Sequence, residues 1–195
     1  MTNINEIAKQ MVAEGKGILA ADESSGTIKK RFDTINVNSS EENRMNYRRI
    51  LFESTEAMQN YISGVILFDE TIRQSNNDGE RLVDIIKKSG SLPGIKVDMG
   101  AKELATMQGE TVTEGLDGLR ERLQEYSNLG AKFAKWRAVI SISNKNPSSL
   151  CIDVNAHALA RYAALCQESG IVPIVEPEVL MDGSHDIQKC YDATK

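Results

Sequence analysis

Short apolar runs that are typical of buried strands alternate with segments of helical apolar spacing along this chain. The expected strands cover residues 17–22, 62–68, 92–98, 131–140 and 171–180. Between them, apolar side chains recur every three or four residues, as at Leu116, Leu119 and Leu123. This alternation predicts right-handed βαβ units around a parallel sheet.

Two α/β architectures satisfy this alternation: an open doubly wound sheet and a closed barrel. The turn after the first strand lacks the GxGxxG pattern, which weakens the dinucleotide-binding version of the open sheet. A TIM (β/α)8 barrel takes about 250 residues, and these 195 residues supply its first five strands with their helices. We therefore expect a partial barrel, a single truncated domain over residues 1–195, in an incomplete sequence.

Capping and breaking residues place the expected helices. We predict helices over residues 2–14, from the capping-box pair Ser39 and Glu42 through Tyr61, over 82–89, over 116–129, from Pro147 to Gly170, and from a Ser184 cap to Lys195. The segment directly after the first strand is predicted to be a polar loop.

Composition excludes some classes of protein. The net charge of -5 and a pI near 5.2 argue against general nucleic-acid binding, which needs a basic face. The three cysteines, an odd number without a CxxC pair, favour reduced thiols in a cytosolic protein. Because the sequence shows neither a signal peptide nor a long apolar run, we expect a cytoplasmic protein with no membrane anchor.

Charged side chains gather at the C-terminal ends of the expected strands, where parallel α/β folds place their active sites. The seven residues are Asp22, Lys96, Asp98, Lys135, Arg137, Glu176 and Glu178. All of them except Asp22 form pairs within one strand. The two members of such a pair, for example Lys96 and Asp98, lie two residues apart and therefore on one face of their strand. Because an unpaired buried charge is costly, these residues either surround one shared pocket or form separate salt bridges at the sheet edge.

This mixture of charges favours carbonyl chemistry through an iminium ion on a phosphorylated sugar. Lysines among carboxylates in a partly dry pocket are expected to have lowered pKa values and to act as nucleophiles or proton carriers. Glu176 and Glu178 are expected to exchange protons, since two neighbouring carboxylates do not both ionise readily. The surplus of cations suits an anionic substrate.

A second cluster of polar and basic residues follows the first strand. Its members include Ser24, Thr27, Lys30 and Arg31. Hydroxyls, a glycine and cations in one loop can cradle a phosphate group. A solvated loop is the alternative interpretation.

Six motifs together carry a resemblance to a known family. They are ILAADESSGTIKKR at 18–31, GVILFDET at 64–71, GIKVDMG at 94–100, GETVTEGLDGL at 109–119, AKFAKWRAVI at 131–140 and GIVPIVEPEVLMDGSHD at 170–186. In order and spacing, the chain resembles class I fructose-bisphosphate aldolase over its whole length. The resemblance implies a metal-independent and cofactor-independent lyase of glycolysis and gluconeogenesis. Such an enzyme cleaves fructose 1,6-bisphosphate through a Schiff base on a lysine of the sixth strand.

The resemblance also assigns roles to residues of this chain. Asp22 would orient the substrate hydroxyl and assist cleavage, and Lys135 would lie beside the Schiff base. Glu176 would be the main general acid and base, and Glu178 would tune its neighbours. The residues expected to bind substrate are Lys96, Arg137, Lys30, Arg31, Arg44, Ser24 and Thr27.

This chain departs from the family pattern at two positions and by one absence. Thr27 stands where many members have Ser, and Met99 stands where many have Lys. The Schiff-base lysine, the phosphate-binding serine and arginine of later strands, and the C-terminal tail have no counterpart. We therefore expect the chain to be inactive alone, with Lys135 as the nearest substitute nucleophile.

Three functional hypotheses follow. The first is part of a glycolytic aldolase that binds a phosphorylated sugar and is a homotetramer at full length. The second is a half-barrel that does not catalyse and serves as a binding or assembly module. The third is a different Schiff-base enzyme, such as a transaldolase-like protein.

Overall fold

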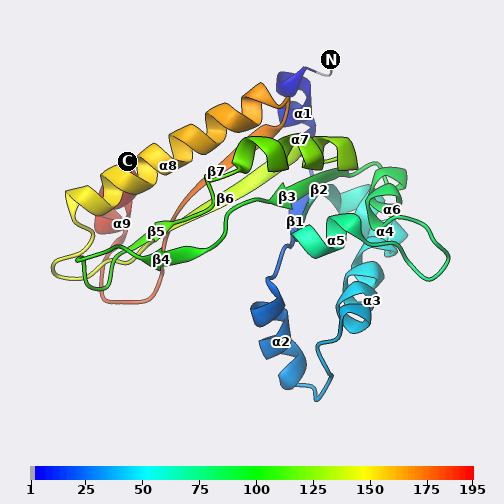
Figure 1. The fold of residues 1–195 in the computed structure, drawn as a ribbon, viewed down its shortest axis with the longest axis horizontal. Coiled ribbons are helices and arrows are strands. Elements are labelled where there is room, and N and C mark those ends of the chain that lie inside the picture. Colours follow the sequence, from blue (N-terminus) through cyan, green and yellow to red (C-terminus); the bar gives the residue numbers. More distant parts are fainter. Residues whose placement is uncertain (1–2) are drawn as a thin grey trace.

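A curved sheet of five parallel strands organises the chain, and the computed structural model describes residues 3–195 of it. The strands are β1 (Gly17–Ala21), β2 (Ile62–Leu67), β3 (Leu92–Lys96), β6 (Phe133–Ile140) and β7 (Val172–Val179). They lie side by side in the order β1-β2-β3-β6-β7, and each neighbouring pair is parallel. The prediction of a partial barrel with five strands is confirmed (Figure 1).

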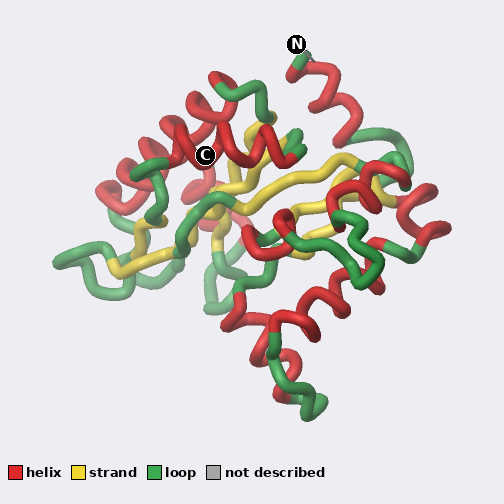
Figure 2. Tube along the Cα trace, turned by 45° about the vertical axis from the view of Figure 1, so that its right-hand side comes forward, coloured by secondary structure: helices red, strands yellow, loops and turns green. Residues whose placement is uncertain are grey.

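Helices surround this sheet, and those that pack on the larger core cover its outer face. They are α1 (Ile4–Met11), α2 (Ser25–Asp33), α3 (Glu41–Phe52), α4 (Thr55–Tyr61), α5 (Asp69–Arg73), α6 (Leu82–Lys88), α7 (Leu119–Leu129), α8 (Ser149–Glu168) and α9 (Ile187–Thr194). The long helix α8 packs on β6 and β7 and lies beside α7, whereas α2 and α3 extend away from the sheet (Figures 1 and 2). None of the helices described is long and apolar enough to cross a membrane.

Two hydrophobic cores lie on opposite faces of the sheet. The larger core lies between the strands and the outer helices and includes Trp136, whose ring is 5.5 Å from that of Tyr162 on α8. The smaller core joins Phe133 and Ile66 to Ile7 and Met11 of α1, which packs against β2 and β7. The even-numbered residues of β6 therefore face the outer helices. The odd-numbered residues after Phe133 are free to line a site on the inner face.

The segment after β1 is a helix, so the prediction of a polar loop there is wrong. Ser24 caps α2 by accepting a hydrogen bond from the Thr27 backbone N–H. Ile28 and Phe32, four residues apart, bury one face of the helix among charged neighbours. Two buried apolar residues are too few to give a clear helical pattern in a sequence.

Other element boundaries also differ from the predictions. The helix expected through Tyr61 is broken into α3 and α4 around Ser54, whose hydroxyl donates to the Ile50 carbonyl. Helix α8 begins at Ser149, after a Ser148 cap, rather than at Pro147. Asp186 rather than Ser184 caps α9 by accepting a hydrogen bond from the Lys189 backbone N–H. Helix α5 and the antiparallel hairpin of β4 (Ala101–Glu103) and β5 (Thr111–Thr113) were not predicted.

Candidate functional site

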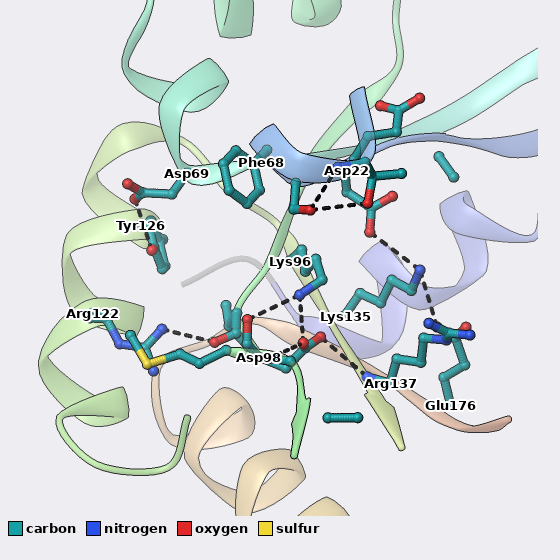
Figure 3. Close-up of a pocket in the computed structure, with 18 of the residues that line it drawn as sticks. Asp22, Phe68, Asp69, Lys96, Asp98, Arg122, Tyr126, Lys135, Arg137 and Glu176 are labelled. Atoms are coloured by element: carbon teal, nitrogen blue, oxygen red, sulfur yellow. Dashed lines mark hydrogen bonds and ion pairs between the residues drawn. The ribbon is translucent and has the colours of Figure 1, made fainter. Parts of the chain in front are cut away.

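A cleft of about 920 Å³ opens at the C-terminal ends of the strands. All seven strand-end charges expected from the sequence line it: Asp22, Lys96, Asp98, Lys135, Arg137, Glu176 and Glu178. Asp22 and Asp98 lie just beyond β1 and β3, and the other five lie within strands. The expectation of one shared pocket therefore holds in this structure, and the pocket is built largely from ion pairs (Figure 3).

Lys135 of β6 lies at the centre of the site, between two carboxylates. Its Nζ is 3.3 Å from Asp22 Oδ2 and 3.3 Å from Glu176 Oε2. Three strand spacings separate β1 from β6 in the sheet order, which would be about 14 Å in a flat sheet. The curvature of the sheet brings Asp22 within reach of Lys135, and Figure 3 shows the lysine joining the two acids.

The two acids set the charge of Lys135. Burial by itself lowers the pKa of the Lys135 ammonium, but the charges of Asp22 and Glu176 outweigh burial and raise that pKa above its ordinary value. The expectation of lowered lysine pKa values is therefore wrong for Lys135. At neutral pH this side chain is a cation with two anionic neighbours, not a free amine.

Asp98 organises the neighbouring part of the cleft. Its carboxylate, of which 2% is exposed, pairs with the Lys96 ammonium. The carboxylate also accepts hydrogen bonds from the backbone N–H groups of Gly100 at 3.0 Å and Arg137 at 3.4 Å. Asp98 thus holds Lys96, the loop after β3 and the adjacent strand β6 together. The sequence marked Asp98 as a strand-end charge but gave it no function of its own.

Arg137 and the two glutamates complete the row of charges. Arg137 Nε donates to Glu178, and this hydrogen bond raises the pKa of the Arg137 guanidinium against the effect of its partial burial. Glu176 pairs with Lys135 instead. The two glutamates thus hold different cations, and their expected role in proton exchange stays a prediction.

The structure divides the other residues expected to bind substrate into two groups. Ser24, Thr27 and Arg31 line the cleft, and the hydroxyls of Ser24 and Thr27 lie 3.0 Å apart. Lys30 is exposed on α2 outside the residues that line the cleft. Arg44 also lies outside the lining, where its Nε donates to Glu70 at 2.9 Å.

Sequence reasoning missed one wall of the cleft. Asp69, Arg73 and Glu125 form an ion-paired group there, and the Tyr126 hydroxyl donates to Asp69 at 2.9 Å. Arg122 donates to the Val97 carbonyl at 2.8 Å and so fixes the end of β3. Asp69 follows β2 by two residues, so extending the strand-end rule by that distance would have found it.

Comparison with known proteins identifies the family. The family model described as "Glycolytic: Fructose-bisphosphate aldolase class-I" matches residues 3–195. The chain belongs to the class I fructose-bisphosphate aldolase family. The resemblance inferred from the motifs is confirmed, and the transaldolase-like alternative is set aside.

The class I aldolase relatives are similar to the chain throughout its length. A probable fructose-bisphosphate aldolase class 1 of Xanthomonas axonopodis pv. citri is 60% identical over 190 residues, 97% of this chain. The cytosolic fructose-bisphosphate aldolase 4 of Arabidopsis thaliana is 59% identical over 181 residues, 93% of this chain. The chain spans 57% of the length of the first relative and 46% of the second.

A solved aldolase structure has the same fold. The fructose-bisphosphate aldolase of Plasmodium falciparum, crystallised with TRAP and a small-molecule inhibitor, is similar with a TM-score of 0.94 and 48% identity. The match covers 98% of this chain and 55% of that one. The fold of this chain therefore matches about half of that solved aldolase chain.

Proposed function

We propose that this chain carries substrate-binding and proton-transfer groups of an aldolase that reversibly cleaves fructose 1,6-bisphosphate to dihydroxyacetone phosphate and glyceraldehyde 3-phosphate. The observation that carries the proposal is the position of Lys135, 3.3 Å from both Asp22 and Glu176 inside one cleft. Small-molecule sites typically enclose about 300–1,000 Å³, and the cleft of about 920 Å³ lies within that range.

The charge state of Lys135 determines its role in this proposal. A lysine must lose its proton before it attacks a ketone, and the raised pKa of Lys135 opposes that step. Lys135 therefore acts as a fixed cation that binds the substrate and holds the carboxylates of Asp22 and Glu176 on either side of it. Asp22 then orients a substrate hydroxyl, and Glu176 transfers protons to and from the oxygen of the reacting carbonyl.

The remaining lining groups bind the anionic parts of the substrate. Lys96 and Arg31 supply positive charge, and Ser24 and Thr27 supply hydroxyls beside the N-terminal end of α2. Arg137, held by Glu178, contributes a further cation. For Lys30 and Arg44, the substrate-binding role continues to depend on the family resemblance alone.

The carbon–carbon cleavage step needs an electron sink that these residues do not supply. The resemblance assigns that sink to a lysine on a sixth strand, and the sheet within residues 3–195 has five strands. We therefore propose that this chain binds the sugar bisphosphate but does not cleave it. Whole-protein properties proposed from the same resemblance are a homotetramer and a cytoplasmic location.

A binding measurement tests the proposed function. Isothermal titration of the 195-residue chain with fructose 1,6-bisphosphate is expected to show one site. Loss of a hydrogen bond to a charged group costs about 1.5–3 kcal/mol, so Lys96→Met should weaken binding by roughly 10- to 150-fold. Lys29→Met is the matched control, because Lys29 is exposed, pairs with Asp33 and does not line the cleft.

The outcome separates the proposal from its alternative. Equal affinity in the Lys96 and Lys29 variants would show that the cleft is not the site. No binding by the unchanged chain would favour a half-barrel that serves as an assembly module. Borohydride reduction in the presence of dihydroxyacetone phosphate should leave every lysine unmodified, and a stable adduct on any of them would contradict the assignment of the electron sink.

A further inference from the structure

A fully buried arginine that the proposed chemistry does not use lies on α3, behind the cleft. The exposed fraction of the Arg48 side chain is 0%. Its Nη2 donates to the Glu23 carbonyl oxygen at 2.6 Å, and its Nη1 donates to Thr71 Oγ1 at 2.5 Å. Nη1 also lies 3.5 Å from Glu70 Oε2, and the guanidinium carbon lies 5.7 Å from the centre of the Phe68 ring.

Apolar packing alone does not require a charge at this position. Burial lowers the pKa of the Arg48 guanidinium, although arginine keeps its proton in proteins. An apolar side chain of similar volume would fill the same space without the desolvation cost. What distinguishes arginine is a rigid planar fork that donates in two directions at once.

The two arms of Arg48 hold two different walls of the cleft. Glu23 follows Asp22 directly after β1, so the carbonyl that Arg48 binds belongs to the residue next to the catalytic carboxylate. Thr71 lies in α5, which follows β2 and begins beside Phe68, another residue that lines the cleft. Arg48 therefore fixes the segment after β1 relative to the segment after β2.

We propose that Arg48 is a positioning residue that sets the carboxylate of Asp22 against Lys135 by holding the Glu23 carbonyl and helix α5 together. The inference rests on the proposed function only for the role of Asp22. The placement of Asp22 itself can be measured without any substrate.

The pKa of Lys135 depends on where the Asp22 carboxylate lies. Whether this pKa rises or falls in an Arg48 variant distinguishes a positioning role from a direct electrostatic effect. Removing the positive charge of Arg48 would by itself raise the Lys135 pKa, because a like charge is lost. Displacing the Asp22 carboxylate from Lys135 would lower the same pKa, because an opposite charge is lost. Positioning and direct electrostatics thus predict opposite signs.

The experiment is an NMR pH titration of the 195-residue chain after reductive methylation with ¹³C-formaldehyde. The Lys135 signal is assigned by its disappearance in Lys135→Arg. We expect its pKa to fall in Arg48→Met, and also in Arg48→Lys, which keeps the charge but loses the fork. Asp22→Asn shows how far the Lys135 pKa falls when the Asp22 charge is removed altogether. In the double variant with Arg48→Met, the Lys135 pKa should fall no further.

Controls keep the result interpretable. Arg49→Met changes the next residue of α3, a partly exposed arginine near Glu53, and should leave the Lys135 pKa unchanged. Fluorescence of the single buried tryptophan, Trp136, verifies folding of each variant. If Arg48→Met does not fold, Thr71→Val replaces it, because this change removes one acceptor while Arg48 stays, and a smaller fall is expected.

An unchanged or raised Lys135 pKa in a folded Arg48→Met chain would overturn the positioning role. The proposed function is tested separately, by binding of fructose 1,6-bisphosphate. Absence of binding together with the expected fall in pKa would count against the proposed function alone.

Discussion

The ring of Phe133 on β6 packs against Gly64 of β2 and Gly94 of β3. The substitution Gly94→Ala therefore tests how closely β6 packs against these strands. A β-carbon added at Gly94 would lie 2.3 Å from two ring carbons of Phe133 and 2.6 Å from a third. One added at Gly64 would lie 2.8 Å from the same ring. Because Phe133 is fully buried against α1, the ring has little room to retreat.

The magnitude follows from two opposing effects. Overpacking by one methyl group lowers the free energy of unfolding by about 1–3 kcal/mol. Replacing glycine with alanine also restricts the unfolded chain, which raises the free energy of unfolding by about 0.4–1 kcal/mol. The overlap at Gly94 is about 1 Å relative to an ordinary contact, so the upper half of the first range applies. We expect a net loss of about 1–2.5 kcal/mol in the free energy of unfolding, and a melting temperature lower by roughly 2–10 °C.

Urea unfolding followed by Trp136 fluorescence measures this loss. Gly17→Ala is the matched control, because an added β-carbon there meets no atom within 4 Å. The control should gain about 0.4–1 kcal/mol. The double variant Gly94→Ala, Phe133→Leu should recover part of the loss. If Gly94→Ala unfolds at the same or a higher urea concentration than Gly17→Ala, the inferred close packing of the Phe133 ring against Gly94 is refuted.

Two further predictions follow from ionisable groups. The raised Lys135 pKa implies a stabilising contribution that is complete below the ordinary lysine pKa of about 10.4 and is lost as the pH rises through the higher folded value. The difference in urea midpoint between the unchanged chain and Lys135→Met should therefore shrink from pH 8 to pH 11, and a constant difference would contradict the ion pairs. Burial raises the pKa of the Cys166 thiol to about 12 and also raises that of Cys151. Cys190, which is partly exposed, should therefore react first with Ellman's reagent, and equal rates for the three thiols without urea would contradict the packing of α8.

The sequence predicted what depends on local pattern. The strands are largely apolar runs, so their places along the chain and their approximate ends could be predicted, and so could the charged residues near their C-terminal ends. Gly90 and Gly130 mark helix ends because both adopt the positive φ that glycine allows. The hairpin of β4 and β5 has short strands without a clear alternation, so no pattern in the sequence predicted it.

What the sequence could not predict depends on contacts between distant residues. Asp22 and Lys135 are 113 residues apart, and only the curvature of the sheet joins them. The same contact reversed the expected direction of the Lys135 pKa, because the number of carboxylates facing a lysine cannot be counted from a sequence. Arg48 and Arg49 are adjacent arginines of one helix, yet one is fully buried and the other partly exposed.

A crystal structure of the chain bound to fructose 1,6-bisphosphate is the most direct measurement of the central claim. We predict that the sugar occupies the cleft, with Asp22, Lys96, Lys135 and Glu176 all within hydrogen-bond distance of it. A ligand bound elsewhere, or those four side chains separated and turned toward solvent, would contradict the account.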